Sequence, residues 1–126
     1  MKTQTRTIML LDDDKFLLDM YAQKFTHVGY IVHAETSTKA ALATLRQGTE
    51  FDAILFDLIM PEGDGFFFLQ VLQKEKLAPD AKKIALTNEM TEEERTRALE
   101  LGADDYIVKA TKIPSEVVEY VTRILK

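Results

Sequence analysis

The chain has no cysteine among its 126 residues. Disulfide bonds and thiolate metal sites are therefore excluded, and a reducing compartment is compatible with the composition. Long apolar runs are also missing, since the stretch TIMLL at 7–11 is followed at once by three aspartates. A signal peptide or a membrane-spanning helix needs a longer apolar run. We therefore expect a cytoplasmic protein that makes no membrane contact.

Basic residues are in the minority, with 16 Lys and Arg against 21 Asp and Glu and a formal net charge of −5. Binding to nucleic acid or to an anionic membrane by charge needs a basic face, so the composition argues against both. Linkers, repeats and low-complexity stretches are not visible. With 46% hydrophobic residues and a length near the commonest domain size, we expect residues 1–126 to form a single domain.

Five short apolar runs alternate with five segments of helical character. The runs do not alternate between apolar and polar residues, which is typical of parallel strands covered on both faces. They lie at 7–11, 30–34, 53–56, 83–86 and 106–109. This order predicts an α/β fold of the (βα)5 type, in which helices cover both faces of a five-stranded parallel sheet through right-handed crossovers.

Capping signals indicate where several helices begin. Side chains that accept a hydrogen bond from the first helical turn are favoured at this position. The candidates are Asp14, Ser37 before a helix at 38–47, Asp64 before a helix at 65–76, and Thr91, which forms a T-x-x-E capping box with Glu94. For Asp14 we favour this capping role over a role as a metal ligand.

Apolar spacing indicates which helix faces are buried. The first helix is expected to bury a stripe of Leu17, Met20, Tyr21, Lys24 and Val28, with Phe16 and Phe25 at its margins. Three consecutive phenylalanines at 66–68 cannot share one face, because neighbouring side chains point about 100° apart, so one should lie near the surface. The helix that ends near Gly102 has few apolar residues, and we expect it to be weakly held.

Polar residues stand at the ends of four predicted strands. Asp12 and Asp13 follow the first strand, Asp57 the third and Thr87 the fourth, while Lys109 ends the fifth. In open α/β sheets the functional crevice lies outside the carboxyl ends of the strands. We therefore expect these five side chains to meet at one rim of the sheet.

The residue types at this rim favour phosphoryl chemistry. Carboxylates gathered without histidine or cysteine are typical of a hard divalent cation such as Mg²⁺. Lys109 supplies a compact positive charge for a phosphoryl or carboxylate oxygen, and Thr87 supplies a hydroxyl that can donate to an anion. The set predicts a site in which Asp57 acts as the nucleophile that receives a phosphoryl group.

Four motifs in register resemble those of response-regulator receiver domains, in particular single-domain chemotaxis regulators. They are LLDDD, FDLIMPEGDG, ALTN and GADDYIVK, and the resemblance covers nearly the whole chain. It implies the flavodoxin-like strand order 2-1-3-4-5. It also implies that Asp57 takes a phosphoryl group from the phosphohistidine of a sensor histidine kinase or a phosphotransfer protein.

The resemblance implies a role for each residue of the metal site. Asp13 and Asp57, with the backbone carbonyl of Ile59, would bind Mg²⁺, and Asp12 would contribute through water. The chain would then act as a regulatory phosphoacceptor that catalyses its own phosphorylation and dephosphorylation, and not as an enzyme on other substrates.

The resemblance also implies how the site would signal. Thr87 and Lys109 would hold the phosphoryl oxygens, and Tyr106 would move inward as Thr87 is drawn to them. The surface of the fourth helix, fifth strand and fifth helix would control a downstream protein, whose identity the sequence leaves open along with dimerisation on phosphorylation. From residue chemistry alone, Tyr106 is equally well explained as ordinary packing.

The chain departs from the family at several positions around the site. Ala110 replaces the usual proline after Lys109, and a cis bond before a non-proline residue costs ~3–4 kcal/mol. We therefore expect a trans Lys109–Ala110 bond and a rearranged loop. Asn88 replaces a smaller residue and narrows access to the site. Ile59 and Glu89 occupy positions that, in this family, influence the water that attacks the phosphoryl group during dephosphorylation. The apolar Ile59 would exclude this water and Glu89 would orient it, so the sequence leaves the rate of dephosphorylation open.

Two other functions compete with the phosphorylation switch. The first is a protein-interaction module that keeps the fold and is never phosphorylated, an alternative that Ala110 and Asn88 keep open. The second is a Mg²⁺-dependent phosphatase that forms an aspartyl intermediate. Such enzymes generally carry a second acid two residues after the nucleophile, where this chain has Ile59, so we disfavour this alternative.

Overall fold

A computed structural model describes residues 5–60, 64–88 and 90–126. Five parallel strands lie in the order β2-β1-β3-β4-β5. In chain order the elements are β1 (Thr7–Leu11), α1 (Lys15–His27), β2 (Ile31–Glu35), α2 (Thr38–Arg46), β3 (Ala53–Phe56), α3 (Gly65–Glu75), β4 (Lys82–Thr87), α4 (Glu92–Glu100), β5 (Asp105–Val108), the 3₁₀ turn η1 (Lys109–Thr111) and α5 (Pro114–Ile124). The fold class and strand order expected from the sequence are confirmed.

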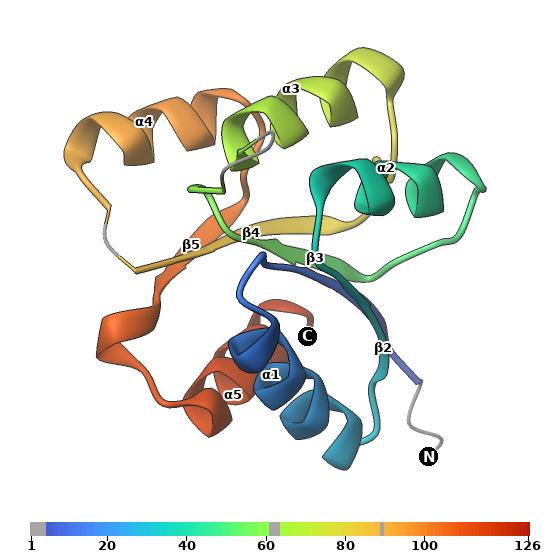
Figure 1. The fold of residues 1–126 in the computed structure, drawn as a ribbon, viewed down its shortest axis with the longest axis vertical. Helices are drawn as coiled ribbons and strands as arrows, with labels where there is room; N and C mark the ends of the chain where they lie inside the picture. Colours follow the sequence, from blue (N-terminus) through green and yellow to red (C-terminus); the bar gives the residue numbers. More distant parts are fainter. Residues whose placement is uncertain (1–4, 61–63, 89) are drawn as a thin grey trace.

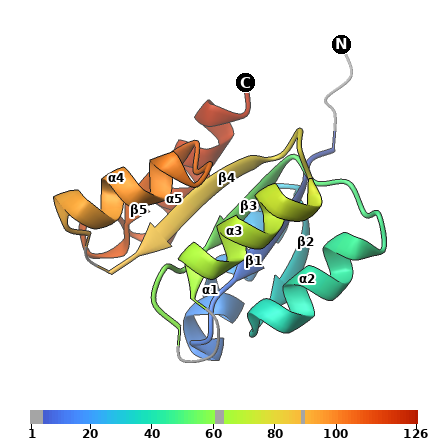
Figure 2. The same cartoon turned by 90° about the horizontal axis from the view of Figure 1, so that it is seen from above.

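Helices cover both faces of the sheet, as Figure 1 shows. Helices α1 and α5 lie on one face and α2, α3 and α4 on the other (Figures 1 and 2). Each face has its own apolar cluster, one centred on the fully buried Phe25 and Val117, the other on Phe56 and Phe68. This double burial explains why the strand sequences are continuously apolar. Within the described ranges, no helix has the length and apolar character needed to cross a bilayer.

The strands lie close to the predicted runs. β1 and β3 have the predicted bounds, β2 lies one residue later, β4 is longer by one residue at each end, and β5 lies one residue earlier. Tyr30 precedes β2 because its amide donates to the Phe25 carbonyl in the turn after α1. Its buried ring meets that of Phe25 edge-on at a centroid distance of 5.0 Å. Lys109 falls outside β5 because it begins the 3₁₀ turn.

The predicted buried stripe of α1 is confirmed at its central residue, Tyr21, and wrong on either side of it. The buried residues of α1 are Leu18, Tyr21 and Phe25. Phe25, placed at the margin by the sequence, is fully buried, whereas Val28 is 57% exposed and lies just after the helix. The edge-on contact between Phe25 and Tyr30 fixes this rotation of the helix, and periodicity alone does not contain that contact.

All four predicted caps are confirmed. Asp14 accepts a hydrogen bond from the Leu17 amide, Ser37 from Ala40 and Asp64 from Phe67. Thr91 and Glu94 form the reciprocal capping box, with distances of 3.0 and 3.1 Å. These side chains satisfy backbone N–H groups that would otherwise lack a partner in the first helical turn.

The start of α3 lies very close to the end of β3. A Cβ atom on Gly65 would lie 2.6 Å from the carbonyl oxygen of Asp57, so only glycine allows this approach. Of the three phenylalanines that follow, Phe66 and Phe68 are buried and Phe67 is 48% exposed, as the helical geometry predicted.

Helix α4 is held by little apolar burial. Of its nine residues only Ala98 is buried, and Leu99 is 44% exposed. The sequence prediction of sparse apolar contact is therefore confirmed. The capping box at Thr91 is correspondingly important for the stability of this helix.

We predict that Thr91→Ala lowers the free energy of unfolding by about 1 kcal/mol, because it leaves the Glu94 amide without its acceptor. Urea denaturation measures this loss, and amide hydrogen exchange should accelerate most in α4. Thr91→Ser keeps the hydroxyl and is the matched control, which should behave almost as the wild type. Equal stability of the alanine and serine variants would contradict the prediction.

Candidate functional site

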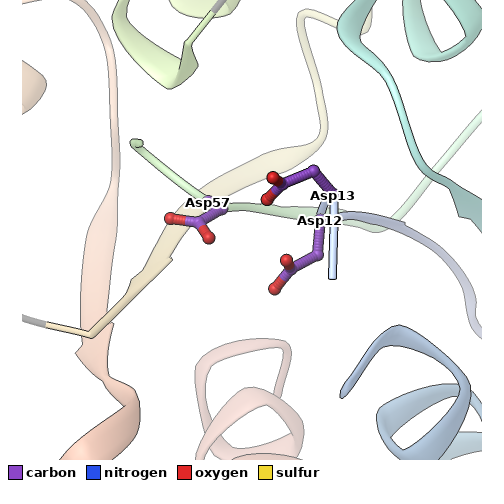
Figure 3. A group of neighbouring side chains, drawn as sticks. All are labelled: Asp12, Asp13 and Asp57. Atoms are coloured by element: carbon purple, nitrogen blue, oxygen red, sulfur yellow. The ribbon is translucent and has the colours of Figure 1, made fainter. Parts of the chain in front are cut away.

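Three carboxylates meet where two neighbouring strands end. Leu11 pairs with Phe56 in the sheet, so Asp12 and Asp57, the next residues, leave β1 and β3 side by side. One carboxylate oxygen from each of Asp12, Asp13 and Asp57 lies within 4.8 Å of the others. Figure 3 shows the three side chains grouped at these strand ends. The structure thus brings together the three acidic side chains that the sequence places in the metal site.

Lys109 joins two of these carboxylates. Its Nζ donates to Asp12 Oδ2 at 2.6 Å and to Asp57 Oδ2 at 3.2 Å. The lysine side chain is only 6% exposed, so these ion pairs are shielded from water. The described residues contain no cis peptide bond, which confirms the predicted trans Lys109–Ala110 bond. Lys109 reaches both carboxylates without the proline usual at the next position.

Thr87 and Tyr106 lie on the same face of the sheet. Tyr106 pairs with Ala85 and Thr87 pairs with Val108, with one pair of residues between them, so the two side chains are two positions apart along the strands and point to the same face. Thr87 is 2% exposed, and Tyr106 is half-buried with the guanidinium of Arg95 over its ring. Thr87 therefore places its hydroxyl at the end of β4, and Tyr106, the residue expected to switch, lies on the same sheet face.

Ile59 contributes to the site through its backbone. Its amide donates to Asp57 Oδ1 at 3.1 Å and helps to hold that carboxylate, while its side chain is 59% exposed. Glu89, which the sequence places next to the site, lies outside the described residues.

These residues border an open depression of about 470 Å³. Its lining contains the five strand-end side chains and Ile59, the predicted Asn88, and also Asp14, Leu17 and Glu94. The sequence places Asp14 directly after the first strand, where we favour a capping role, whereas the position of Glu94 at the rim was not predicted. The signal that could have found Glu94 is the capping box, because a helix that follows a strand directly begins beside the strand's carboxyl end.

Burial raises the pKa of the Asp57 carboxyl, and the nearby Asp12 adds to this effect. The charge of Lys109 and the hydrogen bond from Ile59 act in the opposite direction but do not outweigh burial. For Lys109, burial disfavours the charged amine, yet its hydrogen bond to Asp12 and the charges of both aspartates raise its pKa overall. Lys109 therefore compensates the negative charge of the ionised Asp57 only in part.

The donor set fits a hard cation. Asp12, Asp13 and Asp57 offer only oxygen ligands, and Asp13 is exposed, which leaves room for water as a further ligand. Small oxygen-preferring ions such as Mg²⁺ bind through few carboxylates and keep several waters. A cation here would supply the positive charge that Asp57 lacks.

The family model described as the response regulator receiver domain matches residues 8–122. The chain belongs to the response regulator receiver family. The matched range contains all five polar residues at the strand ends, from Asp12 to Lys109. The resemblance found in the sequence motifs is thereby confirmed.

Individual relatives support this membership. Response regulator SaeR of Staphylococcus aureus USA300 is 32% identical over 118 residues, which cover 94% of this chain and 50% of SaeR. A CheY-like receiver domain protein from Methanospirillum hungatei JF-1 is 30% identical with a TM-score of 0.86, covering 97% of this chain and 94% of its own. This receiver domain spans about half the length of the curated relatives it matches.

A third comparison shows the fold alone. The BeF3-activated receiver domain of DrrB, an OmpR/PhoB homologue of Thermotoga maritima, is 24% identical with a TM-score of 0.80. The alignment covers 97% of this receiver domain and 98% of that chain.

We predict that Asp57→Asn stabilises this receiver domain at pH 7 without divalent cations. Because the folded pKa of Asp57 lies above its unfolded value, stability falls as the pH rises from the unfolded pKa through the folded one. Asparagine carries no charge and avoids this loss. Urea denaturation should give the variant a higher midpoint at neutral pH, and the difference should narrow as the pH is lowered.

Asp13→Asn is the control for this prediction, because Asp13 is exposed and its replacement should shift the midpoint less. A midpoint for Asp57→Asn equal to or below that of the wild type at pH 7 would argue against the electrostatic account.

Proposed function

We propose that this receiver domain is a phosphorylation-activated signalling switch in which Asp57 accepts a phosphoryl group from the phosphohistidine of a sensor histidine kinase or a phosphotransfer protein. The observation that carries the proposal is the meeting of three carboxylates within 4.8 Å, two of them bridged by a buried lysine. Crowded like charges of this kind suit a cation and a transferred phosphoryl group.

Asp57 would act as the nucleophile. One of its carboxylate oxygens forms a bond to phosphorus while the bond between phosphorus and the donor's imidazole nitrogen breaks, and that nitrogen keeps the electron pair. Mg²⁺, held by Asp12, Asp13 and Asp57 with the Ile59 carbonyl, would neutralise the charge on the transferred oxygens when bound. The Ile59 amide already orients the carboxylate, at 3.1 Å from Oδ1.

Lys109 would change partner during the reaction. In the unmodified protein its ammonium is held by Asp12 and Asp57. When Asp57 becomes an acyl phosphate, the negative charge moves outward onto the phosphoryl oxygens, and Lys109 can follow it while Asp12 remains nearby. Thr87 would donate its hydroxyl to another of these oxygens.

The proposed output runs from Thr87 to Tyr106 and then to the surface formed by α4, β5 and α5, which would control a downstream protein. The shared sheet face of Thr87 and Tyr106 and the small buried area of α4 support this direction. We further propose a cytoplasmic location and no catalysis beyond the domain's own phosphorylation and dephosphorylation.

The competing proposal is an interaction module of the same fold that is never phosphorylated. The exposed Asn88 at the mouth of the site is the observation that favours it, because a larger amide there restricts entry of a phosphodonor. The measurement of phosphoryl transfer distinguishes the two functions.

We expect incubation with acetyl phosphate and Mg²⁺ to add one phosphoryl group to the wild type, measured by intact mass. The adduct should be hydroxylamine-sensitive, because it is an acyl phosphate. Asp57→Asn should fold and gain no mass. Asp80→Asn, at an exposed carboxylate far from the site, is the control and should be modified like the wild type. Modification that persists in Asp57→Asn, or none in the wild type, would reject the switch.

We expect calorimetry to detect Mg²⁺ binding to the unmodified wild type. Replacing one charged ligand should weaken this binding by about tenfold or more, because affinity follows the number of charged ligands. Asp13→Asn is the variant of choice, since Asp13 is exposed and lacks an ion pair with Lys109 among the described contacts. Unchanged affinity in this variant would remove Asp13 from the metal site.

A further inference from the structure

Two arginines hold α4 against the rest of the domain. The guanidinium carbon of Arg95 lies 5.1 Å from the ring centroid of Tyr106, and that of Arg97 lies 4.3 Å from the centroid of Phe66. Only Ala98 is buried among the nine residues of this helix. Two cation–π contacts therefore accompany the single buried side chain in attaching this helix.

The two arginines contact rings in different parts of the domain. Phe66 belongs to α3 and is 4% exposed, so its ring is fixed in the core. Tyr106 belongs to β5, is half-buried, and lies two residue pairs away from Thr87 on the same sheet face. Arg95 thus touches an aromatic side chain on the same sheet face as Thr87, whereas Arg97 touches a ring buried in the core.

Arg95 is itself restrained from the side facing solvent. Its Nη1 lies 3.5 Å from Glu92 Oε1, one turn earlier on α4, and the arginine side chain is 44% exposed. The partial exposure keeps the contact with Tyr106 modest in strength. A modest contact can bias an equilibrium between two orientations of the ring without fixing it.

We propose that Arg95 is a positioning residue that holds Tyr106 in the orientation of the unmodified protein and so couples α4 to the phosphoacceptor site. The proposal rests on the phosphorylation switch proposed above. When Tyr106 turns toward Thr87, its ring leaves the guanidinium, and α4 loses one of its two cation–π contacts. Arg95 then opposes activation, while Arg97 supports α4 in both states.

Thermodynamic linkage gives the direction and size of the change in ligand affinity that is expected when the Arg95 contact is removed. A ligand that favours the turned state must overcome the Arg95 contact, so removing this contact should tighten binding of that ligand by the same factor. A cation–π contact at an exposed position corresponds to about a two- to fivefold change in an equilibrium constant. The matching contact of Arg97 with Phe66 should leave the affinity almost unchanged.

The test measures the affinity of beryllofluoride with Mg²⁺, a phosphoryl mimic, for wild type, Arg95→Gln, Arg95→Lys and Arg97→Gln. We expect Arg95→Gln to bind about two- to fivefold more tightly, Arg95→Lys to return toward the wild type because it keeps a cation, and Arg97→Gln to match the wild type. Equal or weaker binding by Arg95→Gln, or equal tightening in Arg97→Gln, would overturn the proposal.

A double-mutant cycle between Arg95→Gln and Tyr106→Leu, read by urea denaturation of the unmodified protein, tests the contact independently of the ligand. A coupling between the two substitutions supports the contact, and strict additivity overturns it. If the wild type bound no beryllofluoride but the cycle showed coupling, the proposed switch would fail and the regulatory role of Arg95 with it, while the contact itself would stand.

Discussion

The ion pairs of Lys109 with Asp12 and Asp57 are the constraint on which the rest of the site depends. Burying two carboxylates side by side is unfavourable unless a cation lies between them, and the lysine provides one from inside the protein. It compensates only part of the charge, because the pKa of Asp57 stays raised and Asp13 has no share in these pairs. The unmodified site therefore remains receptive to a further cation, which is the property that a metal-assisted phosphoacceptor needs.

The sheet makes this arrangement possible through its register. Pairing of Leu11 with Phe56 sends the next residues, Asp12 and Asp57, out of the sheet at the same level. The close approach of Gly65 to the Asp57 carbonyl then ties the start of α3 to this strand end. The site is thus mounted on strands that are buried on both faces, which limits movement of the carboxylates.

Much of this site could be predicted from the sequence because its signals are local. An aspartate directly after a buried apolar run, as at Asp57, or a capping box such as that at Thr91, needs only a few neighbouring residues to be interpreted. The buried face of α1 could not be predicted, since it depends on the ring contact between Phe25 and Tyr30. The stacking of Arg95 on Tyr106 was equally hidden, because it joins elements whose relative placement is set by packing.

The contrast between the rim and α4 explains how one domain can combine precise chemistry with movement. Phosphoryl transfer needs carboxylates held in place, which the double-sided core provides. The proposed signalling needs an element whose position costs little to change, and α4 is suited to it because one buried alanine and two ring contacts replace an apolar face. Weak attachment alone would leave α4 without a defined position to move to. Contacts to Tyr106 and Phe66 instead give it defined partners, so that under the proposed mechanism a change at the rim can favour one arrangement of the helix over another.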